Sequence, residues 1–269
     1  MKALVRTLTG SMDSEVDLPP IFETPYRYDI IHKAYVALDS HHYQPKGVHP
    51  TAGQDVSADS LDPPTGHGQS RVARIRGGGR RQGQAAEVAS TRGGRQAHPP
   101  KSQRVIYKKL NKKENRLALC SAVAATAARD MVESRGHIIR DIESLPILVE
   151  DDAEEISKTK ELLTLLDKLG LSDDINRLKS RRARSGKSLL RGRGKKIGKS
   201  VLIVAESTDS LSQACSAIPG VEAVSAKNLS VLDLAPGSSP GRLTVYTEAG
   251  LESLSKINSP HLELMVTLR

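Results

Sequence analysis

One stretch of this chain, residues 66–100, has a composition that cannot build a hydrophobic core. It contains eight glycines, no leucine and no aromatic residue, and its larger aliphatic side chains are Val72, Ile75 and Val88. Ordering these 35 residues costs roughly 35–70 kcal/mol of backbone entropy at about 1–2 kcal/mol each. Burial of three aliphatic side chains offsets little of that cost, so an ordered structure here requires a partner.

The charge of the same stretch indicates what that partner is. Extended to residue 104, it carries nine cationic residues against one acid, Glu87. Closely spaced arginines favour RNA, because guanidinium pairs with phosphate in a bidentate way and stacks on exposed bases. The stretch is therefore predicted to be an arm that folds against nucleic acid. A flexible linker is the alternative for Gly66–Gly68 and Gly93–Gly94.

The whole-chain composition agrees with an anionic partner. The 269 residues are enough for one large domain or two small ones, and the net charge is +9 with a pI near 9.6. Only 38% of residues are hydrophobic and 3% aromatic, so part of the chain is expected to lie outside a core. Two distant cysteines, no apolar run near 18 residues and no signal-peptide pattern predict a soluble, cytosolic protein.

Periodicity on either side of the arm predicts an α/β body. Short apolar runs are expected as strands at residues 2–8, 146–149, 201–205, 221–226 and 242–247, with residues 16–21 pairing near the first. Helical patterns occupy residues 28–38, 108–131, 151–169, 210–217, 231–235 and 248–257. Continuous apolar strands separated by helices favour a mostly parallel sheet covered by helices. The prediction is one α/β body, residues 1–40 and 105–269, with a long irregular loop inserted at residues 41–104.

Two further basic features lie in the predicted body. The helix at 108–131 begins with Lys108, Lys109, Lys112 and Lys113, which oppose its macrodipole, so an external anion is expected there. A second run, residues 177–199, holds eleven cations and no acid. Its members are Arg177, Lys179, Arg181, Arg182, Arg184, Lys187, Arg191, Arg193, Lys195, Lys196 and Lys199.

The rival class is an α/β enzyme that uses a nucleotide or NAD. Gly198–Ser200 and Gly186–Ser188 read GKS, but Arg193 and Arg181 stand where a P-loop needs its first glycine, and a strand rather than a helix follows residue 200. No strand precedes Gly77–Gly79. The histidines lack metal-ligand spacing, and Cys120 sits on a helix face as a small core residue. The paired acids at 151–152 and 154–155 are interpreted as a solvated first helical turn. No catalytic, metal or cofactor site is predicted.

Long motifs then resemble a known family. They are GHGQSRVARIRGGGRR at 66–81, GGRQAHPPK at 93–101, NKKENRLALCSAVAATA at 111–127, and the segment from Ile218 to Gly250. They resemble the archaeal and eukaryotic branch of large-ribosomal-subunit protein four over nearly the whole chain. The chain stops soon after its last predicted helix, without the eukaryotic extension, which favours an archaeal member.

The resemblance implies a structural constituent of the large ribosomal subunit, located in the cytoplasm. It implies a globular body on the subunit's outer side and a loop, residues 41–104, that threads into 23S-type rRNA during early assembly. The loop tip, within residues 70–84, would help line the nascent-peptide exit tunnel. Expected partners are that rRNA, neighbouring ribosomal proteins and the nascent peptide, with no membrane, no homo-oligomer and no cofactor except Mg²⁺ that accompanies rRNA.

The same resemblance, with the basic runs, nominates site residues. The expected rRNA contacts are His67, Arg71, Arg74, Arg76, Arg80, Arg81, Arg92, Arg95, His98, Lys101, Arg104, Lys108, Lys109, Lys112, Lys113, Arg181, Arg182, Arg184, Arg191, Arg193, Lys195 and Lys196. The expected tunnel tip comprises Arg71, Arg74, Arg76, Gly77, Gly78, Gly79 and Arg80. One departure is that residues 84–91 lack the aromatic expected on the returning limb and carry Glu87. A third reading keeps the arm but places the protein outside the ribosome, as a free RNA-binding regulator.

Overall fold

Short apolar runs of the sequence form the central sheet of the protein. The structure is a computed structural model, and it describes residues 2–60, 62–140, 142–179, 183–194 and 198–267. The chain divides into two compact units: residues 1–40 with 108–269, called the body, and residues 41–107, called the arm. Within the described part of the body, the sheet has six strands in the order β2-β1-β5-β8-β6-β7. The strands are β1 Lys2–Arg6, β2 Met12–Asp17, β5 Ile147–Val149, β6 Leu202–Ala205, β7 Glu222–Ser225 and β8 Thr244–Thr247.

All neighbouring strands of this sheet are parallel except the β1–β2 pair at its edge. The antiparallel partner of β1 is Met12–Asp17, rather than the predicted residues 16–21. Pro20 explains the difference, because it lacks an N–H for a ladder and instead begins the 3-10 helix Pro20–Glu23. The prediction of an α/β fold with a mostly parallel sheet covered by helices is confirmed.

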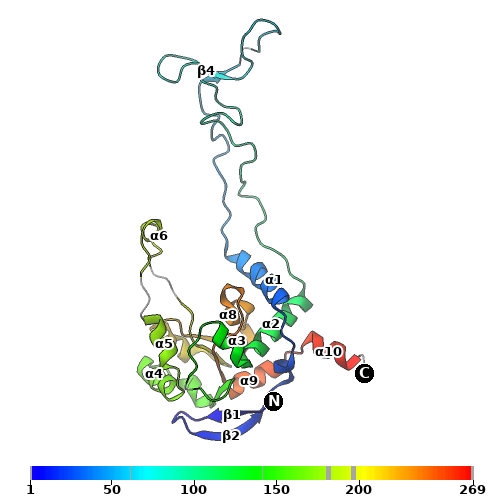
Figure 1. The fold of residues 1–269 in the computed structure, drawn as a ribbon, viewed down its shortest axis with the longest axis vertical. Helices are drawn as coiled ribbons and strands as arrows, with labels where there is room; N and C mark the ends of the chain where they lie inside the picture. Colours follow the sequence, from blue (N-terminus) through cyan, green and yellow to red (C-terminus); the bar gives the residue numbers. More distant parts are fainter. Residues whose placement is uncertain (1, 61, 141, 180–182, 195–197, 268–269) are drawn as a thin grey trace. The chain divides into compact units, whose positions relative to one another are not determined.

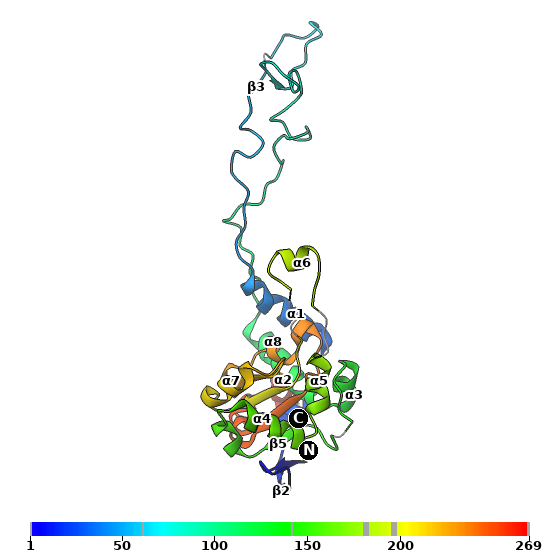
Figure 2. The same ribbon diagram turned by 90° about the vertical axis from the view of Figure 1, so that its left-hand side faces the viewer.

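Helices cover both faces of the sheet (Figures 1 and 2). The α-helices are α1 Tyr28–Asp39, α2 Lys112–Ala127, α3 Arg129–Ser134, α4 Thr159–Lys168, α5 Ser172–Lys179, α6 Lys187–Leu190, α7 Asp209–Ser216, α8 Val231–Leu234, α9 Glu248–Ser255 and α10 Pro260–Thr267. Residues of α4, α5 and α7 bury their apolar side chains on one face, and those of α1, α2, α8 and α9 on the other. Successive strand residues alternate between the two, so Leu148 joins the second cluster and Val149 the first.

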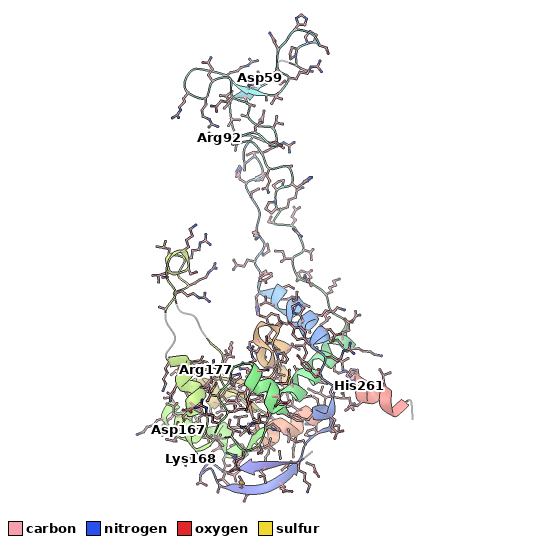
Figure 3. The ribbon with its side chains drawn as sticks, in the orientation of Figure 1. Asp59, Arg92, Asp167, Lys168, Arg177 and His261 are labelled. Atoms are coloured by element: carbon pink, nitrogen blue, oxygen red, sulfur yellow. The ribbon has the colours of Figure 1, made fainter. Side chains whose placement is uncertain are left out.

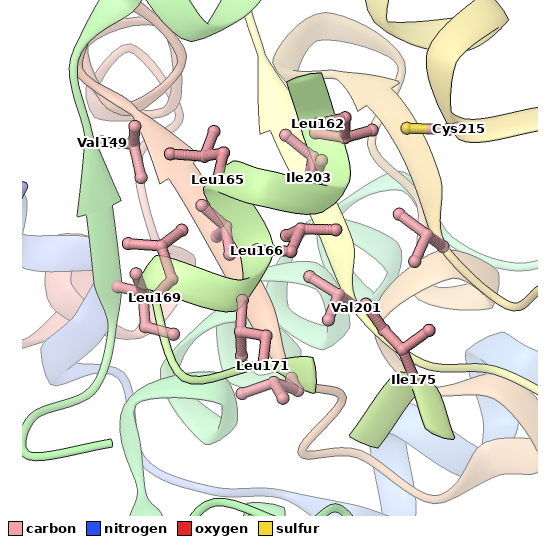
Figure 4. Packing of buried hydrophobic residues seen from close by; sticks show 14 of the residues in the cluster. Val149, Leu162, Leu165, Leu166, Leu169, Leu171, Ile175, Val201, Ile203 and Cys215 are labelled. Carbon is pink, nitrogen blue, oxygen red and sulfur yellow. The ribbon is translucent and has the colours of Figure 1, made fainter. Parts of the chain in front are cut away.

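In the first cluster, apolar side chains of α4 pack against those of the central strands (Figure 4). Leu162, Leu165 and Leu166 follow helical spacing and pack towards β-strand residues that include Val149 and Ile203. Leu162 and Leu166 are at most 1% exposed. Each such leucine contributes about 1.5–3 kcal/mol by burial.

Two predicted helices are interrupted in the structure. Residues 151–169 form a 3-10 helix, Asp151–Glu155, and then α4, because Ile156 is extended between them with ψ 114°. The helix predicted at 108–131 begins only at Lys112, and Ala128, with ψ 111°, separates α2 from α3. The sequence analysis did not anticipate α5, α6 or α10 as separate helices.

Candidate nucleic-acid interface

Three extended segments form the framework of the arm. β3 Ala58–Asp59 pairs antiparallel with β4 Arg74–Ile75, and Arg74 forms an isolated bridge with Ala85 on the other side. The Ile75 N–H donates to the Gln84 carbonyl at 2.9 Å, and the Ala86 N–H to the Ala73 carbonyl at 3.1 Å. Backbone hydrogen bonds therefore hold a segment that was predicted to be irregular.

Glycines allow the two limbs of the arm to approach closely below this framework. Gly53 has φ +83°, and a Cβ placed there would lie 2.5 Å from the Gly94 carbonyl carbon. A Cβ on Gly94 would lie 2.2 Å from the Val88 carbonyl oxygen. The Val48 N–H also donates across the limbs to the Pro100 carbonyl at 3.2 Å. At these positions a side chain would force the backbones apart.

The arm has very little apolar burial, as its composition predicts. Its buried apolar side chains among the described residues are Pro63, Ala73 at 8% exposed and Ala86 at 1%. Val72 and Val88 are 40% and 39% exposed. Nearly all the arm's side chains project outward from a thin backbone (Figure 3).

Three arm arginines are committed to partners within the arm. Arg71 donates to the Thr65 hydroxyl at 2.6 Å, and Arg74 to the Gly83 carbonyl at 2.9 Å. Arg76 forms an ion pair of 3.0 Å with Asp59, with both side chains more than half exposed. Such exposed pairs contribute about 0–1 kcal/mol, so these arginines brace the framework weakly and remain accessible.

The side chains of the other arm cations make no hydrogen bond or ion pair to any part of the chain that the structure describes. They are Lys46, Arg80, Arg81, Arg92, Arg95, Lys101 and Arg104, and all are exposed, as are His67 and His98. Arg80, Arg81 and Arg92, the last labelled in Figure 3, line a cavity of about 590 Å³ together with Gln84 and Gly93. The lining thus combines three guanidinium groups with no acid, a composition that favours an anion such as phosphate.

The backbone at the predicted tip is left-handed at two glycines. Gly77 and Gly79 have φ +100° and +104°, and no atom lies within 4 Å of a Cβ placed at either or at Gly78. The departure at residues 84–91 also has unusual backbone, because Glu87 and Ser90 adopt φ +68° and +76°. These turns leave peptide groups open to a ligand on the tip surface.

In the body, the four lysines before and within the first turn of α2 are exposed. Lys112 and Lys113 belong to the helix, whereas Lys108 and Lys109 precede it. Glu114, in the same turn, bridges to Lys33 of α1 at 2.8 Å. The lysines thus remain available for an external anion.

The second basic run is divided by the structure. Arg184, Lys187, Arg191 and Arg193 lie exposed on a hairpin, residues 183–194, which the Arg184 N–H closes by donating to the Gly194 carbonyl at 2.7 Å. Arg181, Arg182, Lys195 and Lys196 lie outside the described residues. Arg177 and Lys199, the first and last cations of this run, are paired with Asp174 and Glu222.

Asp174 is the centre of a buried polar network at the base of this run. Its side chain is fully buried and accepts from His137 Nδ1 at 3.1 Å, from Arg177 Nε at 2.9 Å and from the Ser200 hydroxyl. Burial by itself would raise the pKa of Asp174, but the hydrogen bonds from His137, Arg177 and Ser200 outweigh it and hold that pKa well below its ordinary value. Arg177, labelled in Figure 3, also donates to the Lys199 carbonyl at 3.2 Å. The network joins the two ends of the basic run.

A second network, around Arg242, lies next to it. Arg242 is 0% exposed and donates to the carbonyls of Ser200 and Asp233, both at 2.9 Å. It also forms an ion pair with Glu222 at 2.8 Å. Neither network was predicted, because partners such as His137 for Asp174 and Glu222 for Arg242 are far apart in sequence and leave no local signal.

The paired acids before α4 lie in a 3-10 turn where Asp151, Asp152 and Glu155 are exposed, as interpreted, but Asp151 and Glu154 also accept hydrogen bonds. The Glu154 carboxylate accepts the backbone N–H groups of Glu206 and Ser207, at 2.8 and 3.0 Å, and the Thr247 hydroxyl at 2.7 Å. The Asp151 carboxylate accepts the Ala249 N–H at 2.7 Å. These donors follow the carboxyl ends of β6 and β8, where parallel sheets bind nucleotide phosphates. The protein's own carboxylates occupy these donors.

The remaining signs of an enzyme also find structural explanations. Ser200 of the GKS motif is fully buried and donates to Asp174, and β6 rather than a helix follows it. Cys120 is fully buried in α2, and desolvation raises its pKa to about 11. Across the described ranges, no three His, Cys, Asp or Glu side chains are placed to hold a metal ion. None of the described helices is long and apolar enough to cross a membrane.

The sequence analysis overlooked the exposed aromatic residues of the arm. His41 stacks on Tyr107 with ring centroids 5.4 Å apart, and Tyr43 is 60% exposed. The available signal was the position of two tyrosines among cations in an otherwise non-aromatic segment.

Comparison with known proteins decides between the classes. Residues 16–257 match the model of the Ribosomal protein L4/L1 family. The chain is 43% identical to the large ribosomal subunit protein uL4 of Methanocaldococcus jannaschii over 95% of this chain and 99% of that protein. It is 42% identical to the uL4 proteins of Methanoculleus marisnigri and Archaeoglobus fulgidus, over 96% and 95% of this chain and 100% and 99% of theirs. These are ribosomal proteins of archaea and not enzymes, and the resemblance stated from the motifs is confirmed: the chain belongs to the Ribosomal protein L4/L1 family.

Proposed function

We propose that this large-subunit protein binds 23S-type rRNA through its arm and the basic surfaces of its body, and that it acts early in subunit assembly. The observation that carries the proposal is the arm itself. It has one proline and two alanines as buried apolar side chains, and seven cations whose side chains have no internal acceptor among the described residues. A segment of this kind gains its stability from phosphate contacts.

The roles of single residues follow from this geometry. Arg80, Arg81, Arg92, Arg95, Lys101 and Arg104 would bind phosphates directly, and Arg71, Arg74 and Arg76 would do so while bracing the framework. His67 and His98 would contact rRNA as exposed polar groups. Lys108, Lys109, Lys112 and Lys113 would form a second contact, and the hairpin with Arg184, Arg191 and Arg193 a third. We retain Arg181, Arg182, Lys195 and Lys196 in that third contact on sequence grounds.

Salt dependence tests this proposal quantitatively. If all nine cations between residues 66 and 104 met phosphates, log K would change with log salt by about −6 to −8. If only the six without an internal acceptor did so, the slope would be about −4 to −5. The measurement is binding of the purified chain to protein-free archaeal large-subunit rRNA, with small-subunit rRNA as the specificity control. A salt-independent affinity would refute the proposal.

A matched pair of variants locates the contact. Replacing Arg80, Arg81 and Arg92 with glutamine should make the slope of log K against log salt less steep by about 2–3 units. The control replaces Lys158, Lys160 and Lys256 of the body with glutamine, which removes the same charge from exposed positions outside the proposed contacts. Equal effects of the two triple variants would mean that net charge, and not the arm cavity, determines the affinity.

We further propose that the tip, Arg71 to Arg80 with Gly77–Gly79, helps line the nascent-peptide exit tunnel. The open left-handed turns at Gly77 and Gly79 support a tip that presents backbone to a narrow space. A photocrosslinking amino acid at Gly78, in ribosomes carrying a stalled nascent chain, should label that chain. The same group at Lys158 of the body should not, and labelling from both positions would contradict the tunnel placement.

Sedimentation with large subunits distinguishes a ribosomal role of this chain from that of a free RNA-binding regulator. The relatives are large-subunit proteins of archaea, so this chain should act in the cytoplasm and remain with large subunits in high salt. Partners there would be rRNA, neighbouring ribosomal proteins and, at the tip, the nascent peptide, with Mg²⁺ present only as a companion of rRNA. Release of the intact protein from subunits at salt that leaves other large-subunit proteins bound would favour the regulator.

A further inference from the structure

Where the two limbs of the arm begin, a cavity of about 460 Å³ lies between residues 42–46 and 100–106. Its lining includes Tyr43, Lys46, Lys101, Arg104 and Val105. This is separate from the cavity of Arg80, Arg81 and Arg92, and neither Tyr43 nor Lys46 was among the residues expected to bind rRNA. Its volume falls in the range of small-molecule sites.

Local backbone contacts shape this cavity without help from the body. The Val48 N–H donates to the Pro100 carbonyl, and this hydrogen bond joins the two limbs that line the cavity. The Arg104 N–H donates to the Lys101 carbonyl at 3.1 Å, so both cations sit on one turn. Gly47 lies so close to the opposite limb that a Cβ there would be 2.9 Å from the Ser102 nitrogen. The His41–Tyr107 stack lies next to the lining residues in both limbs.

The lining combines an aromatic plane with cations and contains no acid. Tyr43 is 60% exposed and Val105 is 66% exposed, in a chain that has only six tyrosines, one phenylalanine and no tryptophan. Lys46, Lys101 and Arg104 supply three positive charges at the same cavity. An aromatic face with adjacent cations is how proteins hold an unstacked base and its phosphates, because every base has a face to stack and every phosphate a charge.

We propose that this cavity receives one unstacked nucleotide of the large-subunit rRNA, with its base on the Tyr43 ring and its phosphates on Lys46, Lys101 and Arg104. The inference rests on the proposed rRNA-binding function and names a contact that phosphate neutralisation alone does not supply. It makes the start of the arm, and not only its tip and middle, a point of RNA recognition.

The test separates stacking from charge. Tyr43→Leu keeps an apolar side chain but removes the aromatic plane, and it should weaken binding to protein-free large-subunit rRNA by about 5- to 100-fold with an unchanged salt slope. Tyr43→Phe keeps the plane and should bind within about twofold of the wild type. Replacing Lys46, Lys101 and Arg104 with glutamine should lower the slope by about 2–3 units. The matched control is Tyr28→Leu, at a tyrosine that is 50% exposed on α1 of the body.

Ultraviolet crosslinking provides a readout that a purely structural role would not change. In the wild-type complex, a nucleotide adduct should map to Tyr43, and Tyr43→Leu should abolish it. If the wild type binds rRNA but Tyr43→Leu binds equally well and no adduct maps to the cavity, the nucleotide site is refuted and the proposed function stands. If the wild type does not bind rRNA, the proposed function itself fails. If Tyr43→Leu impairs only binding to another ribosomal protein, the occupant is a protein and the inference is overturned.

Discussion

At the scale of the residue, buried polar side chains define structure that the surface charge pattern conceals. Asp174 and Arg242 lie among apolar residues, and each is surrounded by hydrogen-bond partners from distant parts of the chain. A buried charge with its partners in place is tolerated, whereas one that loses a partner is costly. We therefore expect Arg177 and Lys199 to stabilise the body through these ion pairs.

Removing the Asp174 charge should destabilise the body. Asp174→Asn leaves Arg177 without its buried carboxylate and should lower the free energy of unfolding by about 3–5 kcal/mol at pH 7. Urea denaturation measures this, and Asp173→Asn, at an exposed neighbour in the same helical turn, should be nearly neutral. Equal stability of the two variants would show that the network is not maintained in solution.

The same carboxylate makes the free energy of unfolding depend on pH. Because the folded state holds the pKa of Asp174 below its ordinary value, its contribution is fully present above the unfolded pKa of about 3.9. The contribution is lost as the pH falls through that value towards the folded pKa. Unfolding free energies between pH 6 and pH 3 should therefore fall more steeply for the wild type than for Asp174→Asn. Parallel curves would contradict the assignment.

Close approach at Gly53 gives a prediction confined to the arm. Gly53→Ala combines a positive φ, which costs roughly 1–2 kcal/mol for an L-residue, with a Cβ 2.5 Å from the Gly94 carbonyl carbon. Amide exchange at Ile75 and Ala86 should accelerate, while the body's unfolding midpoint stays the same. Gly78→Ala, where a Cβ has open space and φ is not positive, is the control. Unchanged arm exchange in Gly53→Ala would refute the close contact.

At the scale of the element, the helix interruption at Ile156 accompanies tertiary hydrogen bonds. Residues 151–169 are amphipathic throughout, yet the helix breaks at Ile156 so that Asp151 and Glu154 can reach backbone N–H groups beyond β6 and β8. These carboxylates satisfy donors at the edge where a related sheet would bind an anionic ligand. The carboxylates of Asp151 and Glu154 therefore occupy the backbone N–H groups that a nucleotide-binding enzyme would offer to a phosphate at this edge.

Neutralising Glu154 tests that role. Glu154→Gln weakens three hydrogen bonds to a carboxylate and should lower the free energy of unfolding by about 1–3 kcal/mol. Asp152→Asn, an exposed acid in the same 3-10 helix, should change it by less than about 0.5 kcal/mol. Thermal or urea unfolding distinguishes them. The prediction does not require Glu154→Gln to bind a nucleotide. An unchanged free energy of unfolding would show that the hydrogen bonds accepted by Glu154 are not needed for stability.

At the scale of the whole molecule, the body holds the two ends of the arm next to each other. The Ser40 hydroxyl, in the body, donates to the Ala37 carbonyl and accepts the Lys108 N–H at 2.8 Å. Ser40 and Lys108 are the residues between which the arm is inserted. The body can therefore complete its sheet and both cores without any residue of the arm.

Deletion of the arm should leave a folded body that no longer binds rRNA normally. Replacing residues 41–107 by a short Gly–Ser linker should leave the urea midpoint of the body unchanged, because the two apolar clusters contain no residue from that range. Affinity for large-subunit rRNA and its salt slope should both fall sharply. Unfolding of this variant would show that the arm contributes to the body's core.

The sequence by itself determined the class of the protein and the parallel sheet, and it predicts that the arm depends on a polyanion. These properties follow from local composition: apolar runs must be buried, and residues 66–100 have almost nothing to bury. Only the tertiary structure decided which charged residues remain available for RNA. Arg177 and Arg80 look alike in sequence, but one meets Asp174 from the same helix and the other meets no acceptor within the described chain. The physical reason is that the fold brings the distant His137 and Ser200 to Asp174, which buries that carboxylate and fixes it as the acceptor of Arg177.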